Sequence, residues 1–359
     1  MKKHMAISFN VALLCTITII PVTLGKTAQD SWVTLESMPT ARCSFGVGVV
    51  DGKIFAIGGN NGTYLAVNEM YDPATDMWIT KAPMPTPRIC FSITVYQNKI
   101  YVIGGIVNSS TPFYSGYTGV TEVYDPQTDT WETKKPMPTP RADLEANVVD
   151  DNIYLIGGSQ YIDVFPFSSG GSNTNEVYNP ANDSWTTKNE IPNSVFGFPS
   201  AVVGNKIYVM GGWSKLTYKL NQIYDTDADT WSYGKNLTID TFNAGVGITT
   251  GNFAPEKIYI FGTHPQSNIA VNVTQIYDYK NDTWSLGTPM PTARYGLEVA
   301  VINDELYAIG GKNQDTYYAT NEKYTPAGYI PEIPDWLVVP VFGVLTILAI
   351  TLYKKMKTG

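Results

Sequence analysis

Four arginines and two glutamates recur at fixed positions in the sequence, and their side chains could bind or transform a ligand. Each arginine stands 16 residues before a Gly-Gly pair or its equivalent, and the four are Arg42, Arg88, Arg141 and Arg294. Glu145 and Glu298 follow the last two arginines by four residues. A guanidinium group binds acceptors through its fork of N–H donors, and a carboxylate can hold hydroxyl groups or transfer protons. The spacing therefore predicts binding residues at the arginines and, if the protein is an enzyme, acid–base residues at Glu145 and Glu298.

Aromatic residues in irregular segments form a second group of predicted binding residues. A Gly-Gly pair is followed by a tyrosine after 13 residues at Gly58 and Gly211, but after 20 at Gly104 and 21 at Gly157. The long segments and their shorter equivalents supply Tyr114, Tyr117, Tyr161, Phe165, Trp213 and Tyr318. Large rings outside strands suit recognition of a protein or a glycan. The alternative is that several rings fold back over the ends of the sheets.

Composition argues against several other chemistries. The net charge of -8, without a run of Lys or Arg away from the termini, disfavours nucleic acid as a partner. The two histidines are His4 and His264, and the sequence has no His-Glu-x-x-His or Cys-x-x-Cys motif, so we expect no metal and no cofactor. Cys43 and Cys90 occupy similar places in neighbouring repeats and either form a disulfide or remain free thiols.

A repeat organises these residues along the chain. Gly-Gly pairs follow apolar segments at 58–59, 104–105, 157–158, 211–212 and 310–311, and Phe261-Gly262-Thr263 is a degraded sixth copy. Each copy continues to a tyrosine, and these are Tyr71, Tyr124, Tyr178, Tyr224, Tyr277 and Tyr324. In the first five copies a tryptophan comes seven residues later, at Trp78, Trp131, Trp185, Trp231 and Trp284. Apolar segments separated by Asp-, Pro- and Gly-rich turns predict short antiparallel strands.

Together with Met-Pro-Thr-x-Arg between the units, this pattern resembles the Kelch repeat over residues 31–326. The resemblance implies an all-β fold, a six-bladed β-propeller with four antiparallel strands in each blade around a central channel. It also implies that the four arginines lie near the mouth of the channel, on the ligand-binding side. The alternative is that each arginine bonds carbonyl groups of the adjoining loop.

The last repeat is split between the two ends of the chain. It contains Tyr324 but no tryptophan after it, whereas Trp32 near the start has no strands before it. We therefore predict that the strand around Trp32 pairs with the strand around Tyr324 and closes the sixth blade. In such a ring blades 3 and 6 stand opposite each other. This predicts that Glu145 and Glu298 face one another across the channel, with Arg141 and Arg294 beside them.

The two ends of the sequence predict export and anchoring. Residues 1–25 have a basic start, an apolar middle and a small residue at the end, which is typical of a signal peptide, although an uncleaved anchor helix is the alternative. Residues 336–353 lack charge and are long enough to span a bilayer, and the tail 354–359 is basic. The Pro-containing linker 327–335 resembles a sortase-type sorting motif, in which case the helix would be removed. Both readings place the protein on the outer face of the cell membrane.

These features favour a binding or adhesion module over an enzyme. A monomeric propeller with variable loops could bind an extracellular protein or glycan without further chemistry. The alternative is an extracytoplasmic carbohydrate-active enzyme of the sialic acid mutarotase kind, which rests on likeness of fold. In that case Glu145 and Glu298 would be the catalytic pair.

Overall fold

The structure is a computed structural model that describes residues 30–108, 116–162, 168–214, 216, 218–264 and 269–331. The predicted signal peptide, membrane-spanning helix and basic tail lie outside these ranges, as does the linker beyond residue 331. Within the described ranges, no helix has the length and apolar character needed to cross a membrane.

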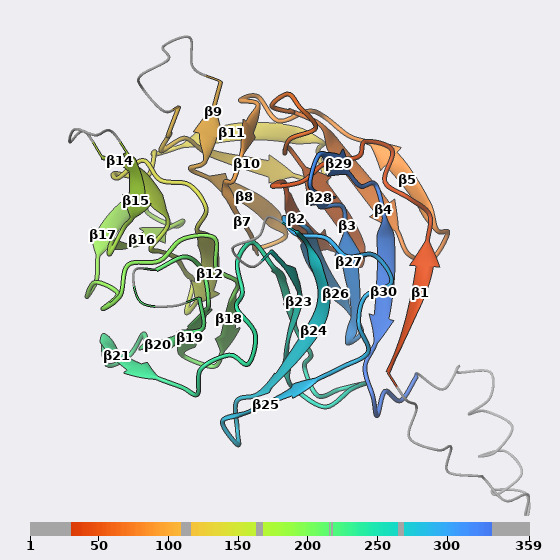
Figure 1. Cartoon of the computed structure of the whole chain (residues 1–359). Helices are drawn as coiled ribbons and strands as arrows, with labels where there is room; N and C mark the ends of the chain where they lie inside the picture. The colour runs from red at the N-terminus through yellow and green to blue at the C-terminus, as the bar shows by residue number, and fades with distance from the viewer. Residues whose placement is uncertain are drawn as a thin grey trace, which may run out of the picture.

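Six four-stranded antiparallel sheets stand around a central axis as the blades of a propeller, which confirms the predicted architecture (Figure 1). Blade 1 contains β2 (Gly46–Val50), β3 (Lys53–Ile57), β4 (Asn68–Asp72) and β5 (Met77–Thr80). Blade 2 contains β7 (Ser92–Tyr96), β8 (Lys99–Ile103), β10 (Thr121–Asp125) and β11 (Thr130–Lys134). Blade 3 contains β12 (Glu145–Val149), β13 (Asn152–Ile156), β16 (Asn175–Asn179) and β17 (Ser184–Thr187).

The remaining blades follow the same order. Blade 4 contains β18 (Ser200–Val203), β19 (Lys206–Met210), β20 (Asn221–Asp225) and β21 (Thr230–Tyr233). Blade 5 contains β22 (Gly245–Ile248), β23 (Ile258–Thr263), β24 (Val271–Asp278) and β25 (Thr283–Leu286). Blade 6 contains β26 (Glu298–Ile302), β27 (Glu305–Ile309), β30 (Asn321–Thr325) and β1 (Ser31–Leu35).

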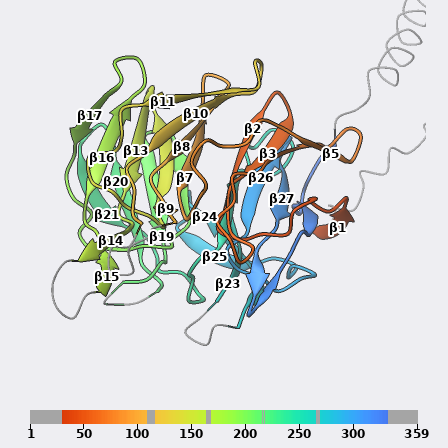
Figure 2. The same cartoon turned by 90° about the horizontal axis from the view of Figure 1, so that it is seen from above.

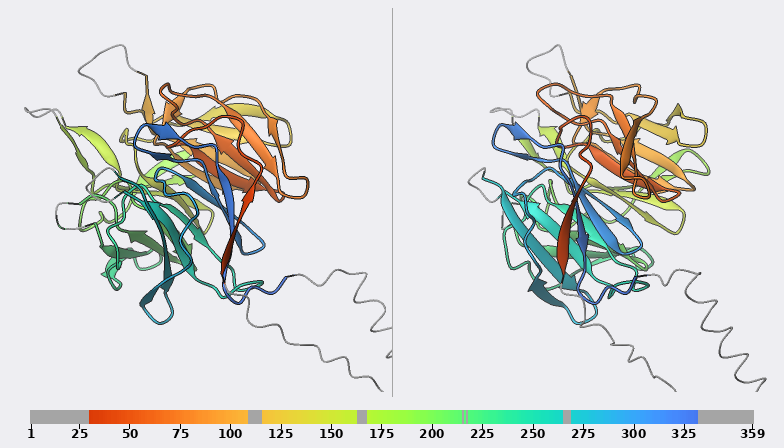
Figure 3. Two further views of the ribbon diagram at one scale, coloured as in Figure 1. Left: turned by 45° about the vertical axis from the view of Figure 1, so that its right-hand side comes forward. Right: turned by 90° about the vertical axis from the view of Figure 1, so that its right-hand side faces the viewer.

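Strand β1 closes the ring as the outer strand of blade 6. It pairs antiparallel with β30, and Trp32 lies opposite Tyr324, as the split repeat predicts. In Figure 3 the red β1 lies beside the blue β30 in both views. The first described strand and the last one are therefore joined by a hydrogen-bonded ladder, which leaves no unpaired seam between the ends of the ring.

Each blade holds the incoming linker with the same three-residue clasp. In blade 1 the Tyr71 hydroxyl donates to Asp76, which accepts a second bond from the backbone N–H of Glu36. The Trp78 indole then donates to the Glu36 carbonyl. The other clasps are Tyr124–Asp129–Trp131, Tyr178–Asp183–Trp185, Tyr224–Asp229–Trp231, Tyr277–Asp282–Trp284 and, in blade 6, Tyr324–Asp30–Trp32. The recurring Tyr and Trp of the sequence thus fasten each blade to the linker that enters it.

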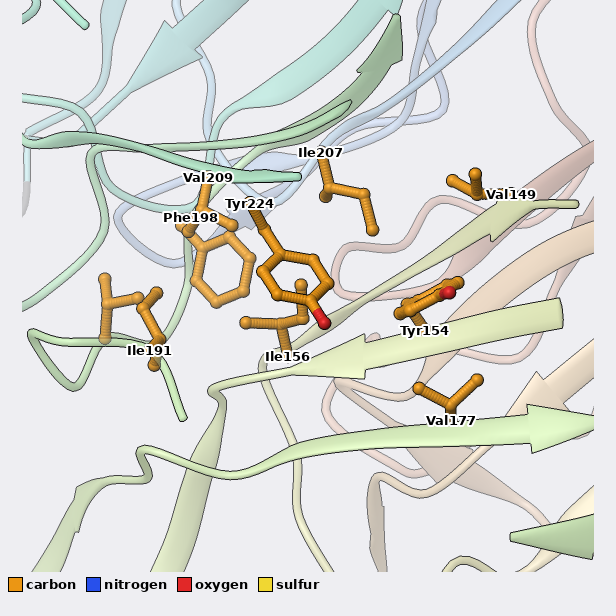
Figure 4. Close-up of a cluster of buried hydrophobic side chains, with 10 residues drawn as sticks. Val149, Tyr154, Ile156, Val177, Ile191, Phe198, Ile207, Val209 and Tyr224 are labelled. Carbon is orange, nitrogen blue, oxygen red and sulfur yellow. The ribbon is translucent and has the colours of Figure 1, made fainter. Parts of the chain in front are cut away.

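The hydrophobic core is divided among the spaces between neighbouring blades. Between blades 3 and 4, Ile156 and Tyr154 on one side meet Phe198 and Tyr224 on the other (Figure 4). These four side chains are at most 6% exposed. Equivalent clusters fill the other five interblade spaces. Burial of large apolar side chains on both faces of every sheet stabilises the ring as a whole.

The innermost strands surround the axis in chain order. Neighbouring pairs among β2, β7, β12, β18, β22 and β26 are in contact, and β26 contacts β2. Blade 3 therefore lies opposite blade 6. Three short two-stranded ladders lie outside the blades. Two are hairpins, β14 (Ser159–Ile162) with β15 (Ser168–Gly171) and β28 (Lys312–Asn313) with β29 (Thr316–Tyr317), and the third pairs β6 (Arg88–Ile89) with β9 (Ile106–Val107).

Candidate functional site at the channel mouth

One face of the propeller gathers the loops that enter the first strand of each blade and the loops that join its second and third strands. The two loop sets pair with each other through backbone bridges. These bridges join Cys43 to Asn60, Ala142 to Ser159, Phe196 to Trp213 and Tyr295 to Lys312, while β6 pairs with β9 in blade 2. We call this side the loop face. The hairpin β14–β15 extends from it, at the lower left of Figure 2.

A closed ring of backbone hydrogen bonds surrounds the channel at this face. One residue from each blade donates its N–H to the carbonyl of the equivalent residue in the preceding blade, at 2.7–3.0 Å. These residues, which we call the hub ring, are Ser44, Cys90, Asp143, Gly197, Asn243 and Gly296. All six have φ between 50° and 63°, a left-handed conformation that Gly, Asn and Asp tolerate best. A side chain at Gly197 would also collide with the ring of Phe242.

A cavity of about 60 Å³ lies in the channel at the hub ring. Its wall consists of the hub ring, the apolar residue that follows each hub residue, and the two glutamates Glu145 and Glu298. The two carboxyl groups therefore face one space from opposite blades, as the register predicts. Burial raises the pKa of Glu145. Burial and repulsion from the carboxylate of Glu145 together raise the pKa of Glu298. Whether they bind or transform a ligand stays a prediction.

Blades 1 to 3 make the polar half of the channel mouth. The Tyr117 hydroxyl donates to Ser159 at 3.2 Å, and the Ser159 hydroxyl donates to Asp143 at 2.8 Å. Cys43 and Cys90 are free thiols. Burial raises the pKa of both, and Asp143 adds to the rise at Cys90, so both thiols are protonated at neutral pH.

Blades 4 to 6 make an aromatic half, which we call the aromatic arc: Trp213, Phe196, Phe242, His264 and Tyr295. Neighbouring ring centroids along this sequence are 5.1, 5.7, 4.8 and 4.1 Å apart. Each of the five side chains is only partly buried. Burial and the nearby ammonium group of Lys312 lower the pKa of His264 to about 4, so its ring is neutral at physiological pH. Rings at these separations attract one another and present a continuous apolar wall to a ligand.

Comparison with known proteins agrees with this architecture. The chain matches the KLHDC2/KLHL20/DRC7 Kelch-repeats domain over residues 80–241 and the Kelch motif over residues 41–85. The chain belongs to the Kelch-repeat β-propeller family. This Kelch propeller is 27% identical over 228 residues to Kelch-like protein terF of Aspergillus terreus, covering 60% of this chain and 46% of that protein. It is 32% identical over 213 residues to Kelch-like protein 15 of Danio rerio, covering 55% of this chain and 34% of that protein. The matches therefore span less than half the length of these relatives.

The four arginines of the Kelch propeller are buried rather than open to a ligand. Each is 0% exposed and forms an ion pair of 2.5–2.8 Å with a glutamate of the third strand: Arg42 with Glu69, Arg88 with Glu122, Arg141 with Glu176, and Arg294 with Glu322. Each guanidinium group also donates to backbone carbonyls. With every arginine enclosed in its own blade, none is open to a ligand in this structure, and the carbonyl groups that they bond belong mainly to the second strand and not to the adjoining loop. The expected pairing of Arg141 and Arg294 with Glu145 and Glu298 is likewise wrong, because other glutamates occupy those arginines.

The predicted aromatic residues fall into three groups. Trp213 and Tyr117 lie at the channel mouth, in the aromatic arc and the polar half respectively. Tyr318 lies at the base of the β28–β29 hairpin, where its carbonyl accepts a bond from the Arg42 backbone N–H. Tyr161 belongs to β14, but its side chain is outside the described part, as are Tyr114 and Phe165 entirely. A binding role for these residues stays a prediction.

Sequence reasoning missed most of the aromatic arc. Phe196, Phe242 and Tyr295 each stand one residue after the arginine position, which is Val195, Thr241 and Arg294 in blades 4 to 6. Aligning this position across the blades would have found them. The arginine pairs had a signal too. Blades 4 and 5, which lack the arginine, carry Gln222 and Gln275 where the other four carry the paired glutamate. The described residues contain no cluster of His, Cys, Asp and Glu able to hold a metal ion.

Proposed function

We propose that this Kelch propeller is a binding module that holds a protein partner on its loop face, over the channel mouth. The aromatic arc carries the proposal, because five partly exposed rings in contact supply the rigid apolar surface on which protein interfaces concentrate their binding energy. The polar half beside it supplies hydrogen-bonding groups around that surface. The family relationship supports the same function, since several of the relatives are Kelch-like proteins built on the same repeat.

We further propose that the propeller works outside the cell, tethered at its C-terminal end, as the composition of residues 1–25 and 336–359 indicates. Protease added to intact cells should digest the propeller. A propeller that is protected until the cells are lysed would contradict export and leave the binding proposal intact.

A carbohydrate-active enzyme is the weaker alternative. The facing carboxyl groups of Glu145 and Glu298 favour it, but their cavity of about 60 Å³ holds only a few water molecules. A sugar ring is several times larger and would have to bind above the hub ring, away from both carboxyl groups. A glycan on the aromatic arc remains compatible with a binding module.

Site-specific photocrosslinking in living cells tests the binding proposal. A photoreactive amino acid at Trp213 or Tyr317 on the loop face should capture a partner protein. The same residue at Met77 or Leu286, which are 56% and 60% exposed on outer strands, is the control. Capture of a partner protein from the outer-strand positions, with no capture from the loop-face positions, would contradict the proposal.

A further inference from the structure

Glu145 and Glu298 differ from the buried glutamates of the blades in having no positive partner. Glu69, Glu122, Glu176 and Glu322 each bind an arginine and also accept a hydrogen bond from a threonine hydroxyl at 2.6–2.7 Å. Across the part of the chain that the structure describes, no salt bridge and no hydrogen-bond donor reaches the carboxyl group of Glu145 or Glu298. Both side chains are only partly buried, because they line the channel cavity. A carboxyl group held there without a positive partner is less favourable than one paired with arginine.

The architecture of the blades does not require a carboxyl group at this position. The other four blades carry the small or ring-closed residues Gly46, Ser92, Pro199 and Gly245 there. At Gly46 and Gly245 a Cβ atom would collide with Ile93 and Val299 of the next inner strand. Glutamate therefore occurs only in the two opposed blades, where both side chains reach the same cavity. This placement indicates a role for the pair beyond folding.

The size and charge of the cavity define what could occupy it. About 60 Å³ admits a single small polar group. A third carboxyl group, Asp143, lies on the rim, and a cation in the cavity would favour the ionised form of all three. A divalent metal would need more oxygen ligands than two opposed carboxylates offer, and the described residues hold no metal-binding cluster. An ammonium group is compact and has three N–H donors, which suits two facing carboxylates and the rim.

We propose that this cavity receives the ammonium group of a lysine side chain that the protein partner inserts along the channel axis from the loop face. The proposal rests on the proposed function, and it names the chemistry by which the partner is recognised. The flexible four-carbon stem of the lysine would pass through the hub ring, so that only the ammonium group enters the cavity.

The mouth already shows that its rings accept an ammonium group. The Nζ atom of Lys312 lies 5.6 Å from the centroid of the Tyr295 ring and 5.7 Å from that of Tyr317. An incoming lysine can use the aromatic arc in the same way before it reaches the carboxyl groups. Lys312 would repel it at the rim, and Asp143 would attract it, so the two nearby charges oppose each other.

Binding should be linked to proton release. In the free protein the raised pKa of both glutamates keeps protons on them near neutral pH, and an ammonium ion between them favours the ionised form. Affinity should therefore rise with pH. The other titratable groups around the channel are Asp143, Cys90, Cys43, His264 and Lys312. Of these, Asp143, Cys90 and Cys43 have pKa values raised by burial, the pKa of Lys312 is also raised, and His264 is neutral near physiological pH.

The first experiment uses n-butylammonium, which reproduces the end of a lysine side chain, with the full chain labelled with ¹³C at the glutamate carboxyl carbons. Resonances of Glu145 and Glu298, assigned from E145Q and E298Q, should move toward the ionised position as the probe is added. Each variant should weaken binding by at least about tenfold, as expected for loss of a charge-assisted hydrogen bond. The exposed Glu190 supplies the control E190Q, which should bind like the wild type. The neutral probe n-butanol should leave both resonances in place.

If n-butylammonium leaves both resonances unmoved, or binds E145Q and E298Q as well as the wild type, the cavity is not an ammonium site. Unchanged circular dichroism, with melting temperatures no lower than that of the wild type, establishes that any loss of binding is not a loss of fold.

The second experiment separates a partner's lysine from a free amine. The partner captured by crosslinking at Trp213 is tested against E145Q and E298Q and after chemical acetylation of its lysines. Both treatments should weaken the complex. A partner that binds the variants and the acetylated form normally overturns the inference but leaves the proposed function standing. If the loop face captures no partner at all, the proposed function fails, and so does the partner's lysine as the occupant.

Discussion

The carboxylate of Asp30 accepts a hydrogen bond of 2.6 Å from the hydroxyl group of Tyr324, which lies 294 positions away in the sequence. It accepts another of 2.6 Å from the backbone N–H of Thr288. In blade 1 the same clasp joins Tyr71 to Asp76 only five positions apart. Closure of the ring therefore uses the same contacts that every other blade makes locally, supplied here from the start of the chain.

The change Asp30→Ala should open the seam between the ends of the propeller. It removes the acceptor for Tyr324 and Thr288, and hydrogen bonds to a charged group contribute about 1.5–3 kcal/mol each at most. We expect a melting temperature lower by a few degrees, measured by differential scanning calorimetry. Ala at the exposed Asp315 is the control and should melt like the wild type. A chain starting at residue 42, which lacks β1 altogether, should be destabilised far more, and equal melting would contradict the closure.

Acid should weaken the clasps. Hydrogen bonds from tyrosine hydroxyls hold the pKa of Asp76, Asp129, Asp183 and Asp282 below the ordinary value of 3.8. A carboxylate with a depressed folded-state pKa stabilises the protein above its unfolded pKa, and this stabilisation is lost as the pH falls through the folded value. The free energy of unfolding, measured with urea, should fall steeply below pH 4. In Asp129→Asn part of this slope should disappear, and an unchanged slope would exclude Asp129 as a contributor.

Glu145 and Glu298 should have the opposite effect on the pH dependence. Burial raises the folded-state pKa of both carboxyl groups above the ordinary value of 4.5. Their contribution to the free energy of unfolding is therefore fully present below that ordinary value and is lost as the pH rises through the folded-state pKa. Each carboxyl group can contribute a slope of at most about 1.4 kcal/mol per pH unit. E145Q and E298Q should therefore gain stability over the wild type between pH 5 and pH 8. An advantage that does not grow with pH would show that the carboxyl groups are already ionised at pH 5.

The buried Arg141–Glu176 pair should be replaceable only as a pair. Arg141→Val alone leaves Glu176 charged and enclosed, and breaking a buried ion pair in this way costs about 3–5 kcal/mol. The double change Arg141→Val with Glu176→Gln copies blade 4, which has Val195 and Gln222 at these positions. We expect it to recover at least about half of that loss in a double-mutant cycle of urea unfolding. A double variant as unstable as the single one would mean that packing of the arginine, and not its charge, is what the blade needs.

The sequence by itself determined the number of blades, the strands and the closure of the ring. The repeat of Gly-Gly, Tyr and Trp is a local pattern that recurs six times, and each copy specifies its own turns and interblade packing. Five of the six tyrosines have a tryptophan seven residues later, which leaves Tyr324 and Trp32 unmatched. The pairing of their strands could therefore be predicted from the number of repeats. The opposition of Glu145 and Glu298 followed in the same way, because the ring has six members and the register is shared.

Only the tertiary structure decided which polar side chains remain open to a ligand. The arginines and glutamates of the blades look alike in the sequence, but Arg141 binds Glu176 from the third strand, leaving Glu145 four residues further on without a partner. The aromatic arc likewise joins Trp213, Phe196, Phe242, His264 and Tyr295 from three blades. Contacts between blades depend on where the axis of the ring brings separate loops together. The spacing of residues within one repeat does not encode the distance between loops of different blades, because each loop meets its neighbours only after the ring has closed.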